Sequence, residues 1–327
     1  MFGFSRNASS RQSTSKLAVQ PGVNDGWHKR EEAIMGTAIT VELWSENKAD
    51  GEAAIDAVMQ EMHRINCLMS PHKPESELAQ INAGAALAPV AVCTEMFGLL
   101  SRATYFSELS GGAFDITFAA VGRLFDYRLG VRPSAAQLEE ARLAVGYQSM
   151  LLDAATQTVR FLKPNMCIDL GGFAKGHAVD NAARILRDLG ILHANVSAGG
   201  DSRVIGDKRG RPWMIGVRDP RQAGEIIALL PLENTSISTS GDYERFFMAD
   251  GTRFHHLINP FTGKSPDSVR SVTILAEDGL TTEAFSKIVF VLGIEQGLRL
   301  IDAHPEVDAI VVDVAGQLHY SSGLLQP

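Results

Sequence analysis

The segment Ile168–Asp180 combines residue types that favour the binding of an anion. It reads as a strand, a turn at Gly171-Gly172 and a helix that begins near Lys175. Glycines in such a turn let the backbone approach a ligand closely, and the N–H groups and dipole of a helix N-terminus attract phosphate. Lys175 adds a positive charge, and Asp169 offers an acceptor for a ribose or base donor. The motif is neither Walker A nor G-x-G-x-x-G, so on its own it equally fits a tight turn with a surface lysine.

Two further segments place carboxylates beside glycines. Gly199-Gly200-Asp201 follows a predicted strand and, taken alone, is more often a turn than a site. Gly112–Thr117 reads as a loop that enters a strand, with Phe114 and Asp115 exposed at its start; the alternative is a simple strand cap. Neither pattern by itself predicts a site.

Two adjacent histidines follow the polar loop Thr239–Glu244. If His255 and His256 lie in a strand, their side chains point to opposite faces. One imidazole would then face a cleft, where it can accept a proton near neutral pH. A single histidine in such a place is more often structural.

The elements that must position these residues are strands in runs, interrupted by a few long helices. This order favours an α+β fold with largely antiparallel sheet over a doubly wound fold. Apolar residues from Ile55 to Met69 recur at helical spacing, so the methionines there are expected to pack in the core. The other expected helices cover about 95–109, 134 onward, 175–189 and 281–292; the expected strands are 37–43, 159–162, 166–170, 194–198, 213–217, 226–230, 236–239, 269–276, 309–314 and 318–320.

Composition excludes several classes of protein. The 327 residues carry a net charge of −8 without a basic stripe, which argues against binding to nucleic acid or to anionic membranes. Three scattered cysteines form neither a disulfide framework nor a C-x-x-C metal site. A run of about 18 apolar residues, as a transmembrane helix requires, does not occur. We expect a disordered polar tail over residues 1–30, one domain over 31–327 and, because residues 1–25 lack the apolar region of a secretory signal, a cytoplasmic protein.

Taken together, the order and spacing of these segments resemble the ApbE family, the FAD:protein FMN transferases. The resemblance runs from about Ala33 to the end of the chain, and it implies an α+β fold whose two subdomains flank a cleft for FAD. It is carried by Met35–Thr37, Ser76–Asn82, Gly112–Thr117, Asp169–Asp180, Gly199–Asp201, Thr239–Glu244, His256–Gly263 and Ala284–Gly293.

The resemblance also implies an activity and a set of site residues. A Ser or Thr hydroxyl of an acceptor protein, carried on a short motif, attacks the FMN-side phosphorus of FAD and AMP leaves. By similarity His256 is the candidate general base. The implied FAD contacts are Met35, His72 (where relatives often have an aromatic ring), Ala113, Phe114, Asp115, Asp169, Lys175 and the backbone of Ile258.

The sequence departs from the family pattern where a Mg²⁺ ion is implied. The implied ligands are the carbonyl of Gly172 and an Asp and a Thr four residues apart on a late helix, but these two positions hold Glu283 and Lys287. Residues i and i+4 share a helix face, so both side chains should point at one spot. A protonated lysine has no lone pair to give, so its ammonium would sit where the metal would, paired with Glu283. Asn259 also stands where the family has Asp, which removes a carboxylate near His256.

Three hypotheses therefore stay open. The first is an FMN transferase with weaker or altered dependence on Mg²⁺, which Lys175, His256 and the loop Thr239–Glu244 favour. The second is an FAD-binding protein that has lost catalysis, which Lys287 and Asn259 favour. The third is an FAD pyrophosphatase, in which water replaces the acceptor hydroxyl. The same cleft would serve the first and the third.

Overall fold

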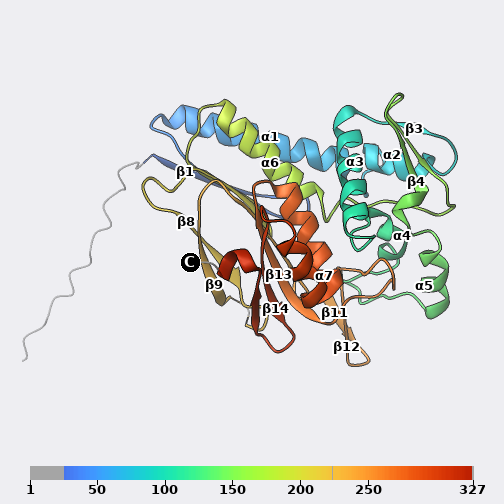
Figure 1. The fold of residues 1–327 in the computed structure, drawn as a ribbon. Helices are drawn as coiled ribbons and strands as arrows, with labels where there is room; N and C mark the ends of the chain where they lie inside the picture. The colour runs from blue at the N-terminus through green and yellow to red at the C-terminus, as the bar shows by residue number, and fades with distance from the viewer. Residues whose placement is uncertain (1–25, 223, 326–327) are drawn as a thin grey trace, which may run out of the picture.

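An eight-stranded antiparallel sheet forms the centre of the structure, a computed structural model that describes residues 26–222 and 224–325 (Figure 1). All of its neighbouring strands pair antiparallel, as the α+β prediction requires. In spatial order the strands are β1 (Trp27–Ile34), β2 (Thr37–Trp44), β6 (Ala194–Ala198), β7 (Asp201–Ile205), β10 (Ser236–Gly241), β13 (Val269–Ala276), β14 (Asp308–Asp313) and β15 (Leu318–Tyr320).

Three long helices pack against the sheet: α1 (Lys48–Met69), α6 (Ala174–Asp188) and α7 (Gly279–Asp302). Strand β2 shows why they do, because its alternate residues are fully buried in the core that the helices share. On α1 the buried side chains recur every three or four residues and include three of its methionines, which confirms their predicted place in the core. These residues are Ile39, Val41 and Leu43 of β2, and Ile55, Val58, Met59, Met62, Ile65 and Met69 of α1.

A hairpin of β8 (Trp213–Arg218) and β9 (Ile226–Leu232) forms a second, smaller core with the sheet. There Trp213 packs with Ile237 and Val204, whose side chains lie on the other side of their strands from Ser238 and Arg203. A second hairpin, β11 (Phe246–Ala249) and β12 (Thr252–His255), leads into the predicted histidine pair.

The remaining elements gather at one end of the main body (Figure 1). Phe106, in the helix α3 (Thr94–Leu109), is fully buried, and its ring contacts those of Phe114, Phe173 and Phe285. The elements at this end therefore share the core that α6 and α7 cover. It contains α2 (Glu77–Gly84), α3 (Thr94–Leu109), η1 (Ile116–Phe118), α4 (Ala119–Gly122), α5 (Ala135–Arg142), η2 (Tyr147–Ser149) and the small sheet β3 (Val90–Ala91), β5 (Thr158–Phe161) and β4 (Met150–Asp153); η3 (Ser322–Leu325) follows β15.

Helices α6 and α7 cap each other. The residue that precedes α6, Phe173, gives no side-chain cap, and instead Glu283 of α7 accepts from the N–H of Gly176 at 2.7 Å. In return Asp180 of α6 accepts from the N–H groups of Gly279 and Leu280 at the start of α7, at 2.8 and 3.1 Å. Each carboxylate satisfies helix N–H groups that have no partner within their own helix and complements the helix dipole. The two N-termini are therefore fixed side by side.

Replacing Gly176 with alanine is expected to lower the free energy of unfolding by about 1–3 kcal/mol, the usual cost of overpacking. A Cβ there would lie 2.2 Å from the carbonyl oxygen of Gly279, so α6 and α7 would have to move apart. Urea titration measures the change. Gly98→Ala is the matched control, because that site in α3 is exposed with nothing within 4 Å, and there alanine should stabilise by about 0.5–1 kcal/mol. Equal effects at both glycines would contradict the proposed packing.

Three expectations from the sequence were wrong in detail. Residues 166–170 join no sheet; instead the side chain of Asn82 bonds both the N–H (2.8 Å) and the C=O (2.9 Å) of Ile168. Gly112–Thr117 leads into the short helix η1 rather than a strand, and Phe114 and Asp115 are buried. The expected domain start at residue 31 falls inside β1; the part of the expected tail over 1–25 lies outside the described residues.

The late helix was predicted to end at Gly293. There the backbone does leave the helical conformation, with φ 77° and ψ −178°, and a second helical segment then continues to Asp302. A positive φ of this size favours glycine. No helix in the described part of the chain is long and apolar enough to cross a bilayer.

Candidate active site: two lysines between two buried carboxylates

A cluster of four charges lies behind the glycine turn, where α6 begins. Lys175 forms ion pairs with Glu283 and with Asp201, the latter at 2.9 Å, and its ammonium also donates to the carbonyl of Gly171 at 3.2 Å. Lys287, one turn along α7, approaches the same Oε1 of Glu283 at 3.4 Å. The side chain of Glu283 is fully buried and that of Asp201 nearly so, whereas both lysines keep about a fifth of their side-chain surface exposed. Part of each lysine side chain can therefore be reached by a ligand.

Serines on β10 and α7 bond to the two acidic residues, to Asp201 through its carboxylate and to Glu283 through its backbone. Ser238 donates to Oδ1 of Asp201 at 2.5 Å, and Ser286 donates to the backbone carbonyl of Glu283 at 2.8 Å. The hydroxyls of Ser240 and Ser286 lie 2.8 Å apart, so all three serines form one buried network. A network of this kind holds charged side chains in a single arrangement.

The charges in the cluster shift one another's pKa values. Burial by itself would lower the pKa of Lys175, but the neighbouring Asp201 and Glu283 outweigh it and raise that pKa above its ordinary value. Burial opposes the ionisation of Asp201 too, yet Lys175 and Lys287 hold its pKa below the usual range. For Lys287 burial prevails and lowers the pKa, with Lys175 acting in the same direction and Glu283 against. Lys175 is thus the most strongly held charge.

His256 lies directly after β12, and its backbone N–H donates to the carbonyl of Arg245 at 3.1 Å. Its Nδ1 is enclosed and has no hydrogen-bond partner among the described residues. Burial lowers the pKa of His256 to about 3, with contributions from His255, Arg245, Lys287 and Lys175. The neighbouring His255 faces the core, where Nε2 lies 2.8 Å from the carbonyl oxygen of Pro266. His255 is therefore structural, whereas His256 lies in the electrostatic field of the two lysines. That the imidazole of His256 serves as a base stays a prediction.

The depressed pKa of His256 should make stability fall in acid. Between the unfolded value of 6.5 and the folded value of about 3, the unfolded chain binds the proton and the folded chain does not. The free energy of unfolding then decreases by up to about 1.4 kcal/mol per pH unit as pH falls below 6.5. His256→Gln removes this term, so the variant should gain roughly 2 kcal/mol relative to the wild type between pH 7 and pH 5. A difference in stability that does not change with pH would contradict the shifted pKa.

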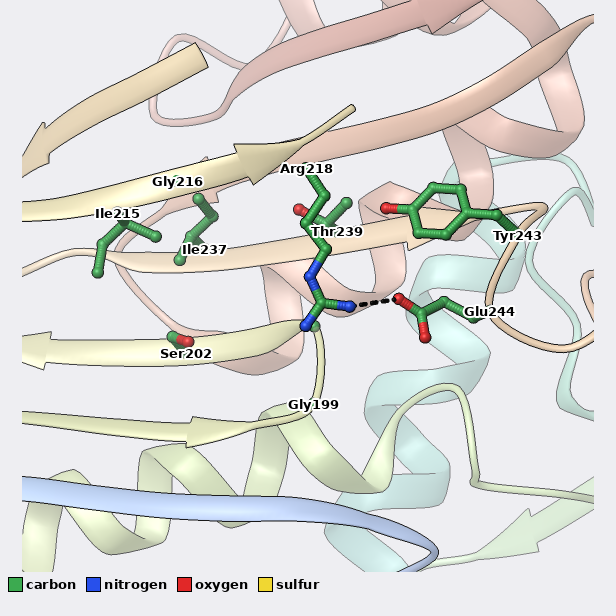
Figure 2. A pocket seen from close by; sticks show the side chains of 10 residues that line it. Gly199, Ser202, Ile215, Gly216, Arg218, Ile237, Thr239, Tyr243 and Glu244 are labelled. Atoms are coloured by element: carbon green, nitrogen blue, oxygen red, sulfur yellow. Dashed lines mark hydrogen bonds and ion pairs between the residues drawn. The ribbon is translucent and has the colours of Figure 1, made fainter. Parts of the chain in front are cut away.

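A separate pocket of about 130 Å³ is lined by Ser202 of β7 and by Ile237 and Thr239 of β10 (Figure 2). Because these residues alternate along their strands with Asp201 and Ser238, the pocket lies on the other side of the two strands from the charged cluster. Arg218 of β8 and Glu244 form an ion pair across it at 3.2 Å, with Tyr243 beside them. Gly199 and Gly200, which lead into Asp201, form part of its wall, so one glycine turn borders both places.

The chain matches the sequence model of the ApbE family over residues 35–311. It belongs to the ApbE family. The proteins named FAD:protein FMN transferase of Treponema pallidum and Klebsiella pneumoniae are each 32% identical to it, over 91% and 85% of this chain and 88% and 87% of theirs. Among solved structures, the ApbE protein of Thermotoga maritima superposes with a TM-score of 0.85 at 34% identity, over 91% of this chain and 98% of that one. The flavin transferase ApbE of Vibrio cholerae gives 0.81 at 27% identity, over 91% and 99%.

Two sets of hydrogen bonds link segments that the ApbE resemblance assigns to the site. Met35 has a positive φ of 54° in the turn between β1 and β2, and the next residue, Gly36, accepts from Arg245, whose carbonyl binds His256. The N–H of Asp169 donates to the carbonyl of Ile116 at 3.0 Å, which ties the glycine turn to the Gly112–Thr117 segment. The turn that holds Met35 is thus linked to His256, and Asp169 to the segment that contains Ala113.

Other assigned residues have different surroundings from those expected. His72 is exposed in the loop after α1, where its N–H donates to Ser70 at 3.3 Å. Ala113, Phe114 and Ile258 are buried. Asp115 accepts from the N–H and hydroxyl of Thr117 (2.8 and 2.6 Å) and from the N–H of Tyr147 (2.9 Å), so its carboxylate is engaged locally.

Two of the acidic side chains that organise the site were missed as site residues. Asp201 was noticed beside its glycines but not assigned to the site, and Asp180 was counted only as the end of a motif. The signal for Asp201 was present, since a carboxylate that directly follows a glycine turn stands at the start of a strand, where it can reach a neighbouring helix. Nothing in the sequence indicates that Asp180 caps a helix almost a hundred residues away.

The three residues expected to hold a metal do come together. A Cβ at Gly172 would lie 3.3 Å from Cε of Lys287, and Lys287 contacts Glu283. Within residues 26–222 and 224–325, however, no group of three His, Cys, Asp or Glu side chains is arranged to hold a metal ion. The Oδ1 of Asn259 accepts from the N–H of Phe261 at 2.9 Å, so this side chain is engaged within its own turn.

Proposed function

We infer that this protein is an FAD:protein FMN transferase, which moves the FMN half of FAD onto a Ser or Thr hydroxyl of an acceptor protein and releases AMP. The observation that carries the inference is the pair of ammonium groups of Lys175 and Lys287 beside the N-terminus of α6. In a chain of the ApbE family, this is the arrangement that a pyrophosphate needs. The relatives with this name extend over most of its length.

The reaction is a transfer between two oxygens. The acceptor oxygen forms a bond to the FMN-side phosphorus, the bond from that phosphorus to the bridging oxygen breaks, and AMP leaves with the electron pair. The acceptor proton goes to a base. Little covalent help is needed, so the protein contributes chiefly position and charge. We assign charge neutralisation to Lys175 and Lys287.

We propose His256 as the base. At neutral pH its imidazole is uncharged, and Nδ1 has no hydrogen-bond partner in the described structure, so it is able to accept a proton. A pKa near 3 makes a weak base. FAD brings negative charge toward Lys175 and Lys287, whose charges help to depress that pKa, so its binding should raise the pKa of His256 toward neutrality.

We also propose the flavin contacts. Met35 and the backbone of the 113–115 segment and of Ile258 line one side of the FAD site, with Asp169 and Lys175 at the pyrophosphate. Asp115 shapes this site through Thr117 and Tyr147 rather than by a direct side-chain bond. His72 would have to approach from its exposed loop. The cytoplasmic location and the Ser/Thr motif of the acceptor stay predictions.

Mg²⁺ does not fit the donors present. Both oxygens of Glu283 and both of Asp201 already hold hydrogen bonds or ion pairs, and Lys287 fills the position of the third expected ligand. No step of the proposed reaction is assigned to a metal.

Product analysis separates this function from the two others. Purified protein is incubated with FAD and a candidate acceptor, and AMP and free FMN are measured by chromatography. Equal amounts of AMP and acceptor-bound flavin are expected. AMP with free FMN would instead show a pyrophosphatase, and bound but unchanged FAD would show a flavin-binding protein without catalysis.

A further inference from the structure

We propose that Lys287 and Lys175 together act as a built-in divalent cation, so that this enzyme binds FAD and transfers FMN without Mg²⁺. The inference rests on the proposed function, because it concerns how the same site neutralises the pyrophosphate. It names a role for Lys287 that a merely structural ion pair on the surface of α7 would not have.

The first argument is that every oxygen of the two buried carboxylates already has a partner. Glu283 uses Oε2 to accept from the N–H of Gly176 at 2.7 Å, and its Oε1 contacts both ammonium groups. Asp201 uses Oδ1 for Ser238 and Oδ2 for Lys175. Mg²⁺ requires near-octahedral oxygen ligands at about 2.0–2.1 Å. At Oε1 of Glu283 and Oδ2 of Asp201 a metal ion would have to compete with an ammonium group for the same oxygen.

The second argument is the place that Lys287 takes. Its side chain runs along the glycine turn: a Cβ added at Gly172 would lie 3.3 Å from Cε of Lys287. The ammonium group of Lys287 points at Oε1 of Glu283. Since residue 283 is one helical turn before residue 287, both reach the same spot. The ammonium thus stands between the turn that faces the ligand and the carboxylate that would bind a metal.

The third argument is charge. Two ammonium groups and two carboxylates sum to zero in this buried cluster, so a divalent cation added there would meet two like charges at close range. The pyrophosphate of FAD instead brings two negative charges to the two lysines and to the N-terminus of α6. The two lysines thus supply the two positive charges that a divalent cation would otherwise bring to these carboxylates.

The experiment compares the wild type with Lys287→Thr and Lys287→Met, each in EDTA and in excess Mg²⁺. The dissociation constant of FAD is measured by flavin fluorescence, and transfer by acceptor-bound flavin. For the wild type both quantities should agree within about twofold in the two buffers. Lys287→Met should weaken transfer by roughly 10²-fold in either buffer, as the loss of one stabilising charge does. Lys287→Thr should lose as much in EDTA and recover in Mg²⁺, because its hydroxyl can serve as a metal ligand.

Lys208→Thr is the matched control, because Lys208 also pairs with a glutamate, Glu42, at 2.6 Å, yet takes no part in the cluster. It should bind FAD and transfer FMN like the wild type in both buffers. If Lys287→Thr does not fold, the wild type in the two buffers and Lys287→Met still test the inference.

Two results would overturn the inference. One is a wild type whose FAD affinity or transfer is lost in EDTA and restored by Mg²⁺. The other is a Lys287→Met variant that binds and transfers like the wild type. The comparison of FAD dissociation constants in EDTA and in Mg²⁺ tests the inference even if no flavin is transferred to an acceptor. A wild type that binds FAD equally in both buffers but forms no product would contradict the proposed function and leave this account of the charges standing.

Discussion

Lys175→Met is expected to lower the free energy of unfolding by about 3–5 kcal/mol, the usual cost of removing one partner from a buried ion pair. Lys175 is the only cation in contact with both buried carboxylates, Glu283 and Asp201, in the described structure. Methionine keeps the length of the side chain but leaves Asp201 without its ion pair. FMN transfer should fall roughly 10²–10³-fold, because an ammonium that faces the pyrophosphate is lost.

A double variant distinguishes these two effects of Lys175→Met. Lys175→Met/Asp201→Asn removes one charge of each sign, so it should recover much of the stability but none of the transfer activity. Urea denaturation and acceptor-bound flavin are the two measurements. A double variant as active as the wild type would contradict the role of Lys175 at the pyrophosphate, and a single variant of normal stability would contradict the cluster itself.

Glu283→Gln should have the second-largest effect, a loss of about 2–3 kcal/mol of stability together with weaker binding of FAD. The side chain of Glu283 is fully buried, caps α6 through Gly176 and balances two ammonium groups. Glutamine can still accept from Gly176, but it turns an N–H₂ donor or a neutral oxygen toward two cations. The lysines then repel each other, and the start of α6 is less well fixed.

Glu295→Gln on the same helix is the control for Glu283→Gln. Glu295 pairs with Arg299 one turn on, and both are largely exposed, so its loss should change stability by less than about 0.5 kcal/mol. Thermal and urea unfolding of both variants measure the difference. Similar small changes at the two positions would contradict the buried cap.

The sequence predicted the parts of this fold that repeat locally. Alternation in β2 and helical spacing from Ile55 to Met69 indicated a half-buried strand and an amphipathic helix, and both are present. Local pattern failed where a distant side chain decides the structure. Residues 166–170 have the composition of a strand, but Asn82 provides the neighbouring hydrogen bonds and no strand lies there. No local signal predicts such a replacement.

In the site, too, local patterns were predictable and contacts between distant residues were not. The adjacent histidines and the Gly171-Gly172 turn were recognisable, and the i, i+4 relation brought Glu283 and Lys287 together as predicted. The partners of these residues could not be predicted, because Lys175 and Glu283 are more than a hundred residues apart and meet only through the packing of α6 on α7. The caps at Asp180 and Glu283 create that packing, and each depends on a contact distant in sequence.

The central claim is that this chain transfers FMN to a protein hydroxyl, and intact-mass spectrometry of an acceptor tests it most directly. The acceptor is incubated with FAD and either the wild type or Lys175→Met. The account predicts that only the wild type attaches one FMN, through its phosphate, to a single Ser or Thr of the acceptor. One AMP is released for each FMN attached. An acceptor of unchanged mass while the enzyme holds FAD, or an equal gain with Lys175→Met, would contradict it.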